Sequence, residues 1–249
     1  MIVIPMAGLS SRFFRVGYKI PKYMLEAHGK TLFEYSVRSF EPYFSSVPFL
    51  FIVKDVYETP EFVEQQANMM GIKDYHIMVL NEDTRGQAET VTLGLEKLAV
   101  SGVEYDGCLT IFNIDTFRPG FLFPKVCETC DGYLEVFEGS GSNWSFAKPV
   151  SVNSTLVIQT AEKNPISNLC STGLYYFSRK QDYLDAYYQY LSIPEIEWEK
   201  GELYIAPLYN ILIRKGLKIH YNLIKPQEVI FCGIPDEYVA FMNRCDVKI

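Results

Sequence analysis

Short apolar runs alternate with amphipathic stretches in the first half of the chain. The apolar runs show little polar alternation, which is typical of strands covered on both faces. The amphipathic stretches have helical spacing, and Thr31 and Pro60 are residue types that favour helix starts. The predicted strands are residues 2–4, 49–53, 75–79 and 108–112, and the predicted helices are residues 31–44, 60–70 and one ending near residue 99. This alternation predicts an α/β fold with a doubly wound, mostly parallel, Rossmann-like sheet and helices on both faces.

The pattern changes after residue 131 to shorter, partly alternating strands, followed by a mostly helical remainder. Gly216 follows one of the later amphipathic stretches and favours a helix end there. The predicted strands are residues 132–137, 144–148, 155–158, 171–177, 217–223 and 229–232, and the predicted helices are residues 182–191, 203–215 and 235–241. We therefore expect these strands to make the sheet mixed.

Composition limits the class of protein. The 249 residues are 48% hydrophobic and 15% aromatic, enough to bury one large core, so we expect a single domain over residues 1–249. A net charge of -7 argues against a nucleic-acid partner, although a few local cations would suffice for a small anionic ligand. The chain shows neither a signal-peptide pattern nor an apolar run of about 18 residues, which predicts a cytoplasmic protein without membrane insertion.

The six cysteines give no metal-ligand pattern. Cys127 and Cys130 form a lone C-x-x-C, and the three histidines, at positions 28, 76 and 220, are far apart in the sequence. We expect reduced structural thiols, with zinc or redox chemistry at the C-x-x-C as the alternative.

The residues after the first predicted strand suit an anion. Backbone amides can point into a cavity only where side chains are small, and this stretch is rich in small residues. Arg12 adds a planar cation that can hold phosphate oxygens bidentately, and Lys22, fixed by the preceding Pro21, adds a compact one. The pattern predicts a polyphosphate-binding loop; the alternative is an ordinary turn with both cations solvated. The predicted loop residues are Met6, Ala7, Gly8, Leu9, Ser10 and Ser11.

A polar loop at residues 81–90 follows the third predicted strand. Loops at the carboxyl ends of parallel strands gather around one crevice, so this loop should lie beside the first. The Gly86 amide and the Gln87 side chain could read the edge of a nucleobase, with Arg85 beside them. The alternative is a helix start capped by Asp83 or Thr84.

Asp115 follows the fourth predicted strand and should face the same crevice as Arg12 and Lys22. A carboxylate there is a natural ligand for Mg²⁺ bridging phosphate groups. The alternative is a carboxylate that caps the following turn.

Two stretches of the second half carry further candidates. Glu162 and Lys163 place an anion beside a cation, so that Lys163 could hold a phosphate and Glu162 the hydroxyls of a sugar. Gly173 interrupts a predicted strand, as expected where a ligand approaches closely. The alternatives are a solvated ion pair and a β-bulge.

The first loop resembles the signature of the sugar-phosphate nucleotidyltransferases, also called nucleoside-diphosphate-sugar pyrophosphorylases. It reads A-G-x-x-S-R-F and then P-K, although Leu9 and Ser10 stand where glycines are frequent in the family. Five more stretches resemble family motifs in the expected order, so the resemblance covers nearly the whole chain. They are N-I-D at 113–115, E-K-N-P at 162–165, S-T-G-L-Y at 171–175, G-E-L-Y at 201–204 and G-I-P-D-E-Y at 233–238.

The resemblance implies the nucleotidyltransferase architecture, similar to that of GT-A glycosyltransferases, with a nucleotide-binding half at residues 1–120 and an acceptor-binding half at residues 121–249. It implies that Asp115 binds Mg²⁺. Many relatives carry a second metal-binding aspartate just before the late glycine turn, where this chain has Phe231 and Cys232, which leaves Asp236 as a candidate. The substrate-binding residues that it implies are Asn113, Glu162, Lys163, Thr172 and Gly173.

The implied activity is the coupling of a nucleoside triphosphate to a sugar 1-phosphate, with release of pyrophosphate. Arg12 would stabilise the departing pyrophosphate, Lys22 the α-phosphate and Lys163 the attacking phosphate. The family resemblance also implies a role in precursor synthesis for cell-surface glycans such as capsule or lipopolysaccharide.

Three alternatives stay open. The acceptor could be a polyol or amino-alcohol phosphate used by a cytidylyltransferase; the chain could be a glycosyltransferase; or it could bind nucleotides without turnover. N-I-D lacks the paired aspartates expected of a glycosyltransferase. The exposed-looking tyrosines at positions 183, 187, 188 and 190 indicate packing or a subunit contact, which would allow a homodimer.

Overall fold

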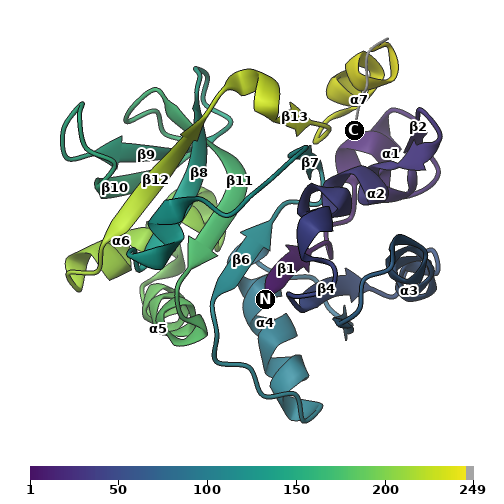
Figure 1. Cartoon of the computed structure of the whole chain (residues 1–249), viewed down its shortest axis with the longest axis horizontal. Helices are drawn as coiled ribbons and strands as arrows, with labels where there is room; N and C mark the ends of the chain where they lie inside the picture. Colours follow the sequence, from purple (N-terminus) through teal and green to yellow (C-terminus); the bar gives the residue numbers. More distant parts are fainter. Residues whose placement is uncertain (245–249) are drawn as a thin grey trace.

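The first strand lies in the middle of a nine-stranded sheet in the computed structural model, which describes residues 1–244. On either side of β1 (Ile2–Pro5), β4 (Phe49–Lys54) and β6 (Leu109–Phe112) run parallel to it. Outside β4, β5 (Tyr75–Leu80) continues the parallel part to the sheet edge (Figure 1). The parallel part of the predicted sheet is therefore confirmed.

The second half extends the sheet with antiparallel pairings. β11 (Leu169–Phe177) pairs antiparallel with β6 and with β8 (Gly132–Glu138), and β12 (Ile219–Ile224) runs parallel to β8. β9 (Ser145–Pro149) and β10 (Val157–Glu162) form an antiparallel pair beyond β11. The sheet is mixed, as predicted.

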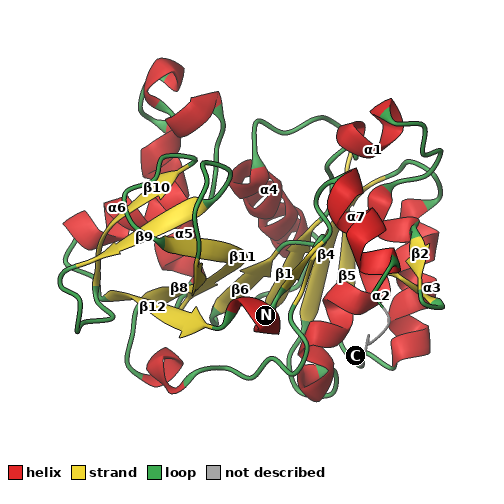
Figure 2. Cartoon of the chain, turned by 90° about the horizontal axis from the view of Figure 1, so that it is seen from above, coloured by secondary structure: helices red, strands yellow, loops and turns green. Residues whose placement is uncertain are grey.

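Helices cover both faces of the sheet. Successive side chains of each strand point to opposite faces, so an apolar strand such as β1 has apolar side chains to bury on both sides. Val3 packs in one core with α4 (Gln87–Val100), α5 (Lys180–Leu191) and α6 (Ala206–Arg214). Its neighbours Ile2 and Ile4 pack in a second core with α2 and α3 (Figure 2). The bounds of these two helices are Leu32–Val37 and Thr59–Met70.

A small subassembly sits beside the first loop. β13 (Ile230–Phe231) pairs with β7 (Thr116–Phe117) and brings the late glycine turn next to Asp115, whose carbonyl accepts a 2.8 Å hydrogen bond from the amide of Cys232. A separate small core joins this pair to the first loop. Its helices are α1 (Ser11–Arg15), α7 (Pro235–Met242) and one face of α2.

The remaining elements are short. The hairpin strands are β2 (Glu26–Ala27) and β3 (Lys30–Thr31). The 3₁₀ turns are Lys22–Met24, Arg38–Tyr43, Lys125–Glu128, Glu195–Glu197, Glu199–Gly201 and Pro226–Glu228.

Two predicted helices differ from the structure. The helix predicted at residues 31–44 begins as expected, with the Thr31 hydroxyl accepting from the Glu34 amide at 3.1 Å, but it is α-helical only to Val37. A 3₁₀ segment containing Pro42 follows, and Phe40 in it is not helical, with φ -105° and ψ 18°. The helix predicted at residues 203–215 begins only at Ala206.

The tyrosines of α5 confirm the interpretation of that stripe as packing. Tyr183, Tyr187 and Tyr190 are buried in the core, and of the four only Tyr188 is exposed. The stripe therefore stabilises the fold from within, and an exposed tyrosine face no longer supports a homodimer.

The C-x-x-C cysteines are poor candidates for metal or redox chemistry. Burial raises the pKa of Cys127 to about 12 and that of Cys130 to about 11. Reactive and metal-binding cysteines have the opposite property, a lowered pKa that favours the thiolate.

Among residues 1–244, no helix is long and apolar enough to cross a bilayer.

Candidate active site

Three adjoining cavities open at the carboxyl ends of the parallel strands, with volumes of about 580, 390 and 430 Å³. The first lies over the loop after β1, the second beside β10 and β11, and the third beside residues 84–87. Gln87 lines all three, whereas Arg12, Asn113 and Asp115 line the first and second. The cavities therefore meet at side chains that the sequence singled out.

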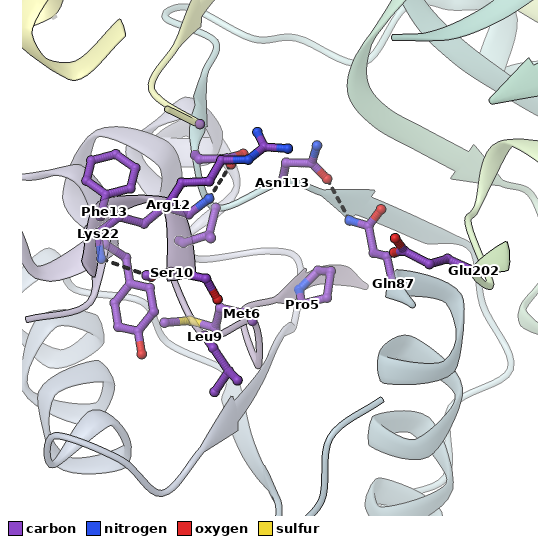
Figure 3. A pocket seen from close by; sticks show the side chains of 16 residues that line it. Pro5, Met6, Leu9, Ser10, Arg12, Phe13, Lys22, Gln87, Asn113 and Glu202 are labelled. Carbon is purple, nitrogen blue, oxygen red and sulfur yellow. Dashed lines mark hydrogen bonds and ion pairs between the residues drawn. The ribbon is translucent and has the colours of Figure 1, made fainter. Parts of the chain in front are cut away.

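The loop after β1 forms the floor of the first cavity. Its backbone turns at Ser10, which has a left-handed conformation with φ 51°, and the Ser10 carbonyl accepts from the Phe13 amide at 2.9 Å. Phe13 is fully buried, which leaves its neighbour Arg12 on the cavity side of α1 (Figure 3). Met6, Gly8, Leu9, Ser10 and Ser11 line the first cavity, and Ala7 and Gly8 line the third.

Lys22 and Asp115 form an ion pair at this cavity, although they are far apart in the sequence. Their side chains are 19% and 22% exposed, so Lys22 is not the solvated surface cation of the alternative interpretation, whereas Arg12 is exposed, as that interpretation expects. The hydroxyl of Ser10 accepts from the Lys22 amide at 3.1 Å and ties the lysine to the loop. The Asp115 carboxylate contacts the Lys22 ammonium and lines the first and second cavities.

The surroundings of Asp115 fit a hard cation. A Cβ on Gly233 would come within 3.1 Å of the Asp115 carboxylate and 3.6 Å of that of Glu237, so this glycine keeps the space beside both carboxylates open. Residues 1–244 contain no cluster of three or more acidic, histidine or cysteine side chains that could hold a metal alone. Substrate phosphates would therefore have to complete the coordination, as is usual for Mg²⁺.

Asp236, the candidate for a second metal ligand, is in the wrong place. It is exposed in the first turn of α7 and lines none of the three cavities. The next residue, Glu237, lines the second cavity instead, and its carboxylate accepts from the Gly233 amide at 2.8 Å. The side chains diverge because neighbouring positions on a helix point about 100° apart.

Gln87, Asn113 and Gly173 form a connected group where the cavities meet. The Gln87 amide donates to the Asn113 side-chain oxygen at 2.6 Å (Figure 3). A Cβ on Gly173 would lie 2.2 Å from the Asn113 side-chain nitrogen, and Gly173 has φ +88°. The group that approaches Gly173 closely in this structure is therefore the Asn113 side chain. The predicted alternative of a β-bulge also holds, since the register of β11 on β8 shifts between Ser171 and Tyr175.

Gly173→Ala should lower the free energy of unfolding by about 2–4 kcal/mol, because it adds steric overlap with Asn113 to an unfavourable backbone conformation. Urea unfolding measures this. The matched control is Gly102→Ala, where φ is +90° but no atom lies within 4 Å of the added Cβ, and it should cost only about 1 kcal/mol. Equal losses in the two variants would contradict the steric account.

The third cavity is built on a backbone pairing between two loops. The amide of Leu203 donates to the carbonyl of Arg85 at 2.9 Å, and the amide of Ala88 donates to the carbonyl of Leu203 at 2.8 Å. Gly86 lies between them with φ 150°, and a Cβ there would come within 2.5 Å of the Leu203 carbonyl oxygen. This pairing explains why α6 starts late.

The capping alternative for this loop is wrong. The residue at the N-cap of α4 is Gly86, whereas Asp83 pairs with Lys54 and the Thr84 hydroxyl lies 2.7 Å from that of Thr90. Arg85 lines the third cavity with Gly86 and Gln87, as predicted, although its guanidinium is also bound to Glu89.

Glu162 and Lys163 both line the second cavity. Glu162 is 6% exposed and accepts a hydrogen bond from the Ser145 hydroxyl, while Lys163 donates to the Tyr204 hydroxyl. The solvated-pair alternative is therefore wrong. Thr172 also lines this cavity, but its hydroxyl donates to the buried carboxylate of Glu135 at 3.2 Å.

Burial raises the pKa of Glu162, and the hydrogen bond from Ser145 only partly offsets the effect. A carboxyl with a raised folded-state pKa destabilises the fold once pH rises above its unfolded value, because the buried group must then ionise. Glu162→Gln should therefore raise the thermal midpoint by roughly 2 °C at pH 7.5, with the gain vanishing below about pH 4.5. Calorimetry across this pH range measures it, and a gain independent of pH would contradict the cause given.

Several residues that line the site had no role predicted from the sequence. They are Trp144, Ser145, Tyr175, Glu202, Tyr204, Phe231 and Glu237. Glu202 and Tyr204 belong to the G-E-L-Y stretch, so that motif was the available signal. Trp144, just before β9, and Phe231, in β13, are far apart in the sequence, and their contact, with ring centroids 4.7 Å apart, left no sequence signal.

Several solved structures share the fold of this chain. A nucleoside-diphosphate-sugar pyrophosphorylase from Vibrio cholerae RC9 is 67% identical, with 98% of this chain and 100% of that chain covered and a TM-score of 0.96. A putative glucose-1-phosphate thymidylyltransferase from Bacillus anthracis is 15% identical over 97% of this chain and 92% of that chain, with a TM-score of 0.74. The inositol-1-phosphate CTP transferase from T. maritima is 16% identical over 97% and 93%, with a TM-score of 0.68.

No family model matches the chain. No curated protein matches it either. The fold and the high identity to one of these structures make the chain a nucleotidyltransferase of the α/β class. Within that class, it belongs to the family of nucleoside-diphosphate-sugar pyrophosphorylases.

Proposed function

We propose that the chain transfers a nucleotidyl group from a nucleoside triphosphate to a sugar 1-phosphate, forming a nucleoside-diphosphate sugar and pyrophosphate. One observation carries the proposal: the wall shared by the first and second cavities holds Arg12 and Asp115, with Lys22 paired to Asp115. A triphosphate in the first cavity would there meet an acceptor phosphate in the second. The 67% identity to a protein named as a nucleoside-diphosphate-sugar pyrophosphorylase supports the same reaction.

In the proposed reaction, an oxygen of the acceptor's phosphate forms a bond to the α-phosphorus while the bond to the pyrophosphate oxygen breaks. Catalysis then consists of positioning the reactants and stabilising charge. Arg12 would stabilise the leaving pyrophosphate, Lys22 the α-phosphate and Lys163 the attacking phosphate. Glu162 would accept hydrogen bonds from sugar hydroxyls.

The base and ribose would lie in the third cavity, against the loop that carries Arg85, Gly86 and Gln87. Glu202 lines both this cavity and the first, beside Gln87 (Figure 3). Its carboxylate is therefore placed between the proposed base and phosphate positions, where it could accept from ribose hydroxyls.

We also propose that Mg²⁺ takes part. Asp115 would hold it together with phosphate oxygens, and Glu237 rather than Asp236 is the second carboxylate that faces this space. When bound, the ion would neutralise charge on the triphosphate. Family membership supports a further proposal, that the product feeds cytoplasmic synthesis of cell-surface glycan precursors.

The proposal can be tested by measuring pyrophosphate release with Mg²⁺ for CTP, UTP, dTTP, GTP and ATP, each against a panel of sugar 1-phosphates. Phosphorylated polyols and amino alcohols belong in the same panel. We expect acceptor-dependent release with one sugar 1-phosphate. Release only with a polyol or amino-alcohol phosphate would show that the acceptor is that compound and not a sugar 1-phosphate. Nucleotide binding without pyrophosphate release across the panel would contradict turnover.

A further inference from the structure

Lys163 is held in an unusual conformation at the second cavity. Its backbone has φ 50°, in the left-handed region that side chains other than glycine rarely adopt. The Lys163 amide donates to the carbonyl of Trp144 at 2.8 Å, which fixes the backbone. A residue kept in such a conformation indicates that the position of its side chain matters.

Tyr204 holds the other end of Lys163. The ammonium donates to the Tyr204 hydroxyl and lies 4.4 Å from the centroid of its ring, within the range of a cation–π contact. Burial and the nearby carboxylate of Glu202 raise the pKa of Tyr204, so its hydroxyl stays neutral and can accept from the lysine.

The backbone on either side of Tyr204 is anchored to the loop of the third cavity. Leu203 is fully buried and exchanges hydrogen bonds of 2.9 and 2.8 Å with Arg85 and Ala88. Ile205, on the other side, is also buried. Tyr204 thus extends from the loop of one cavity to the lysine of another, and Glu202, two residues earlier, lines the first and third cavities.

We propose that Tyr204 is a positioning residue, whose hydroxyl and ring hold the Lys163 ammonium where it meets the acceptor's phosphate. The inference rests on the proposed function in one respect, namely that Lys163 binds this phosphate. Tyr204 itself acts through the lysine. Its anchorage on the Arg85–Ala88 loop makes the place of Lys163 depend on the loop that the proposed nucleotide would contact.

Two substitutions separate the hydroxyl from the ring. Tyr204→Phe keeps the ring and should raise KM for the acceptor about tenfold, with kcat and KM for the nucleotide nearly unchanged, as expected when binding of one substrate is weakened. Tyr204→Leu removes both contacts and should raise the acceptor KM about a hundredfold. Tyr75→Phe is the matched control, because that hydroxyl bonds Asn68 at 3.0 Å outside the three cavities.

A double-mutant comparison tests whether Tyr204 acts through Lys163. In a Lys163→Ala background, Tyr204→Phe should have no further effect on the acceptor KM, because coupled residues are not additive. The same fold-change in both backgrounds would overturn the proposal, as would a normal acceptor KM in Tyr204→Phe.

The accessibility of the Lys163 ammonium tests the positioning role of Tyr204 without requiring turnover. Trace acetylation with acetic anhydride, read by mass spectrometry, should label Lys163 several-fold faster in Tyr204→Phe than in the wild type or Tyr75→Phe, with other lysines unchanged. Equal labelling of Lys163 would overturn the positioning role. Faster labelling in a protein that releases no pyrophosphate would support the positioning of Lys163 while the proposed function failed.

Discussion

Replacing Arg12 with alanine is expected to lower kcat/KM for pyrophosphate release by about two to three orders of magnitude. Arg12 lines both the first and the second cavity, and its position in α1 is fixed by the fully buried Phe13 next to it. It is the one arginine of α1 that faces the proposed triphosphate. Its charge would be most valuable as the pyrophosphate departs, so the loss should fall mainly on kcat.

Arg15→Ala is the matched control for this variant. Arg15 is exposed in the same short helix and lines none of the three cavities. Steady-state kinetics should therefore be within about twofold of the wild type, since surface substitutions have small effects. Normal turnover of Arg12→Ala, or an equal loss in Arg15→Ala, would remove Arg12 from the proposed mechanism.

Asp115→Asn is expected to lower kcat by about three orders of magnitude. The amide keeps the shape of the side chain but removes the charge that pairs with Lys22 and that would hold Mg²⁺. Stability should change less than activity, because both side chains of the pair are partly exposed and such pairs contribute little.

Metal affinity gives a second readout of the same variant. Mn²⁺, followed by electron paramagnetic resonance with a nucleoside triphosphate present, should bind at least tenfold more weakly to Asp115→Asn than to the wild type. Asp236→Asn should leave both metal binding and kcat unchanged, since that carboxylate is exposed outside the three cavities. Weaker metal binding by Asp236→Asn would restore that residue as a second ligand, and unchanged metal binding by Asp115→Asn would contradict the proposed magnesium site.

The parts of the site that the sequence could predict are those set by the topology of a parallel sheet. Asp115 and the loop after β1 both follow buried strands, and the ends of such strands gather at one edge. Residue type then singled out Arg12, Lys22 and Gln87, because cations at that edge suit phosphate groups and an amide suits the edge of a nucleobase. The cavities indeed meet at Gln87, Arg12 and Asp115.

Other features depend on contacts that no local pattern encodes. Asp236 and Glu237 are equally good candidates in sequence, and only the phase of α7 decides that Glu237 faces the second cavity. The start of α6 depends on the backbone pairing of Leu203 with Arg85. The role of Gly173 likewise depends on Asn113, which reaches it from another strand end.

The fate of the α-phosphorus tests the central claim most directly. With the active substrate pair, triphosphate labelled at the α-position should give a nucleoside-diphosphate sugar containing all of the transferred label, together with one unlabelled pyrophosphate for each product molecule. Label recovered in free nucleotide or on the protein, or sugar transfer without pyrophosphate, would contradict nucleotidyl transfer to the acceptor's phosphate.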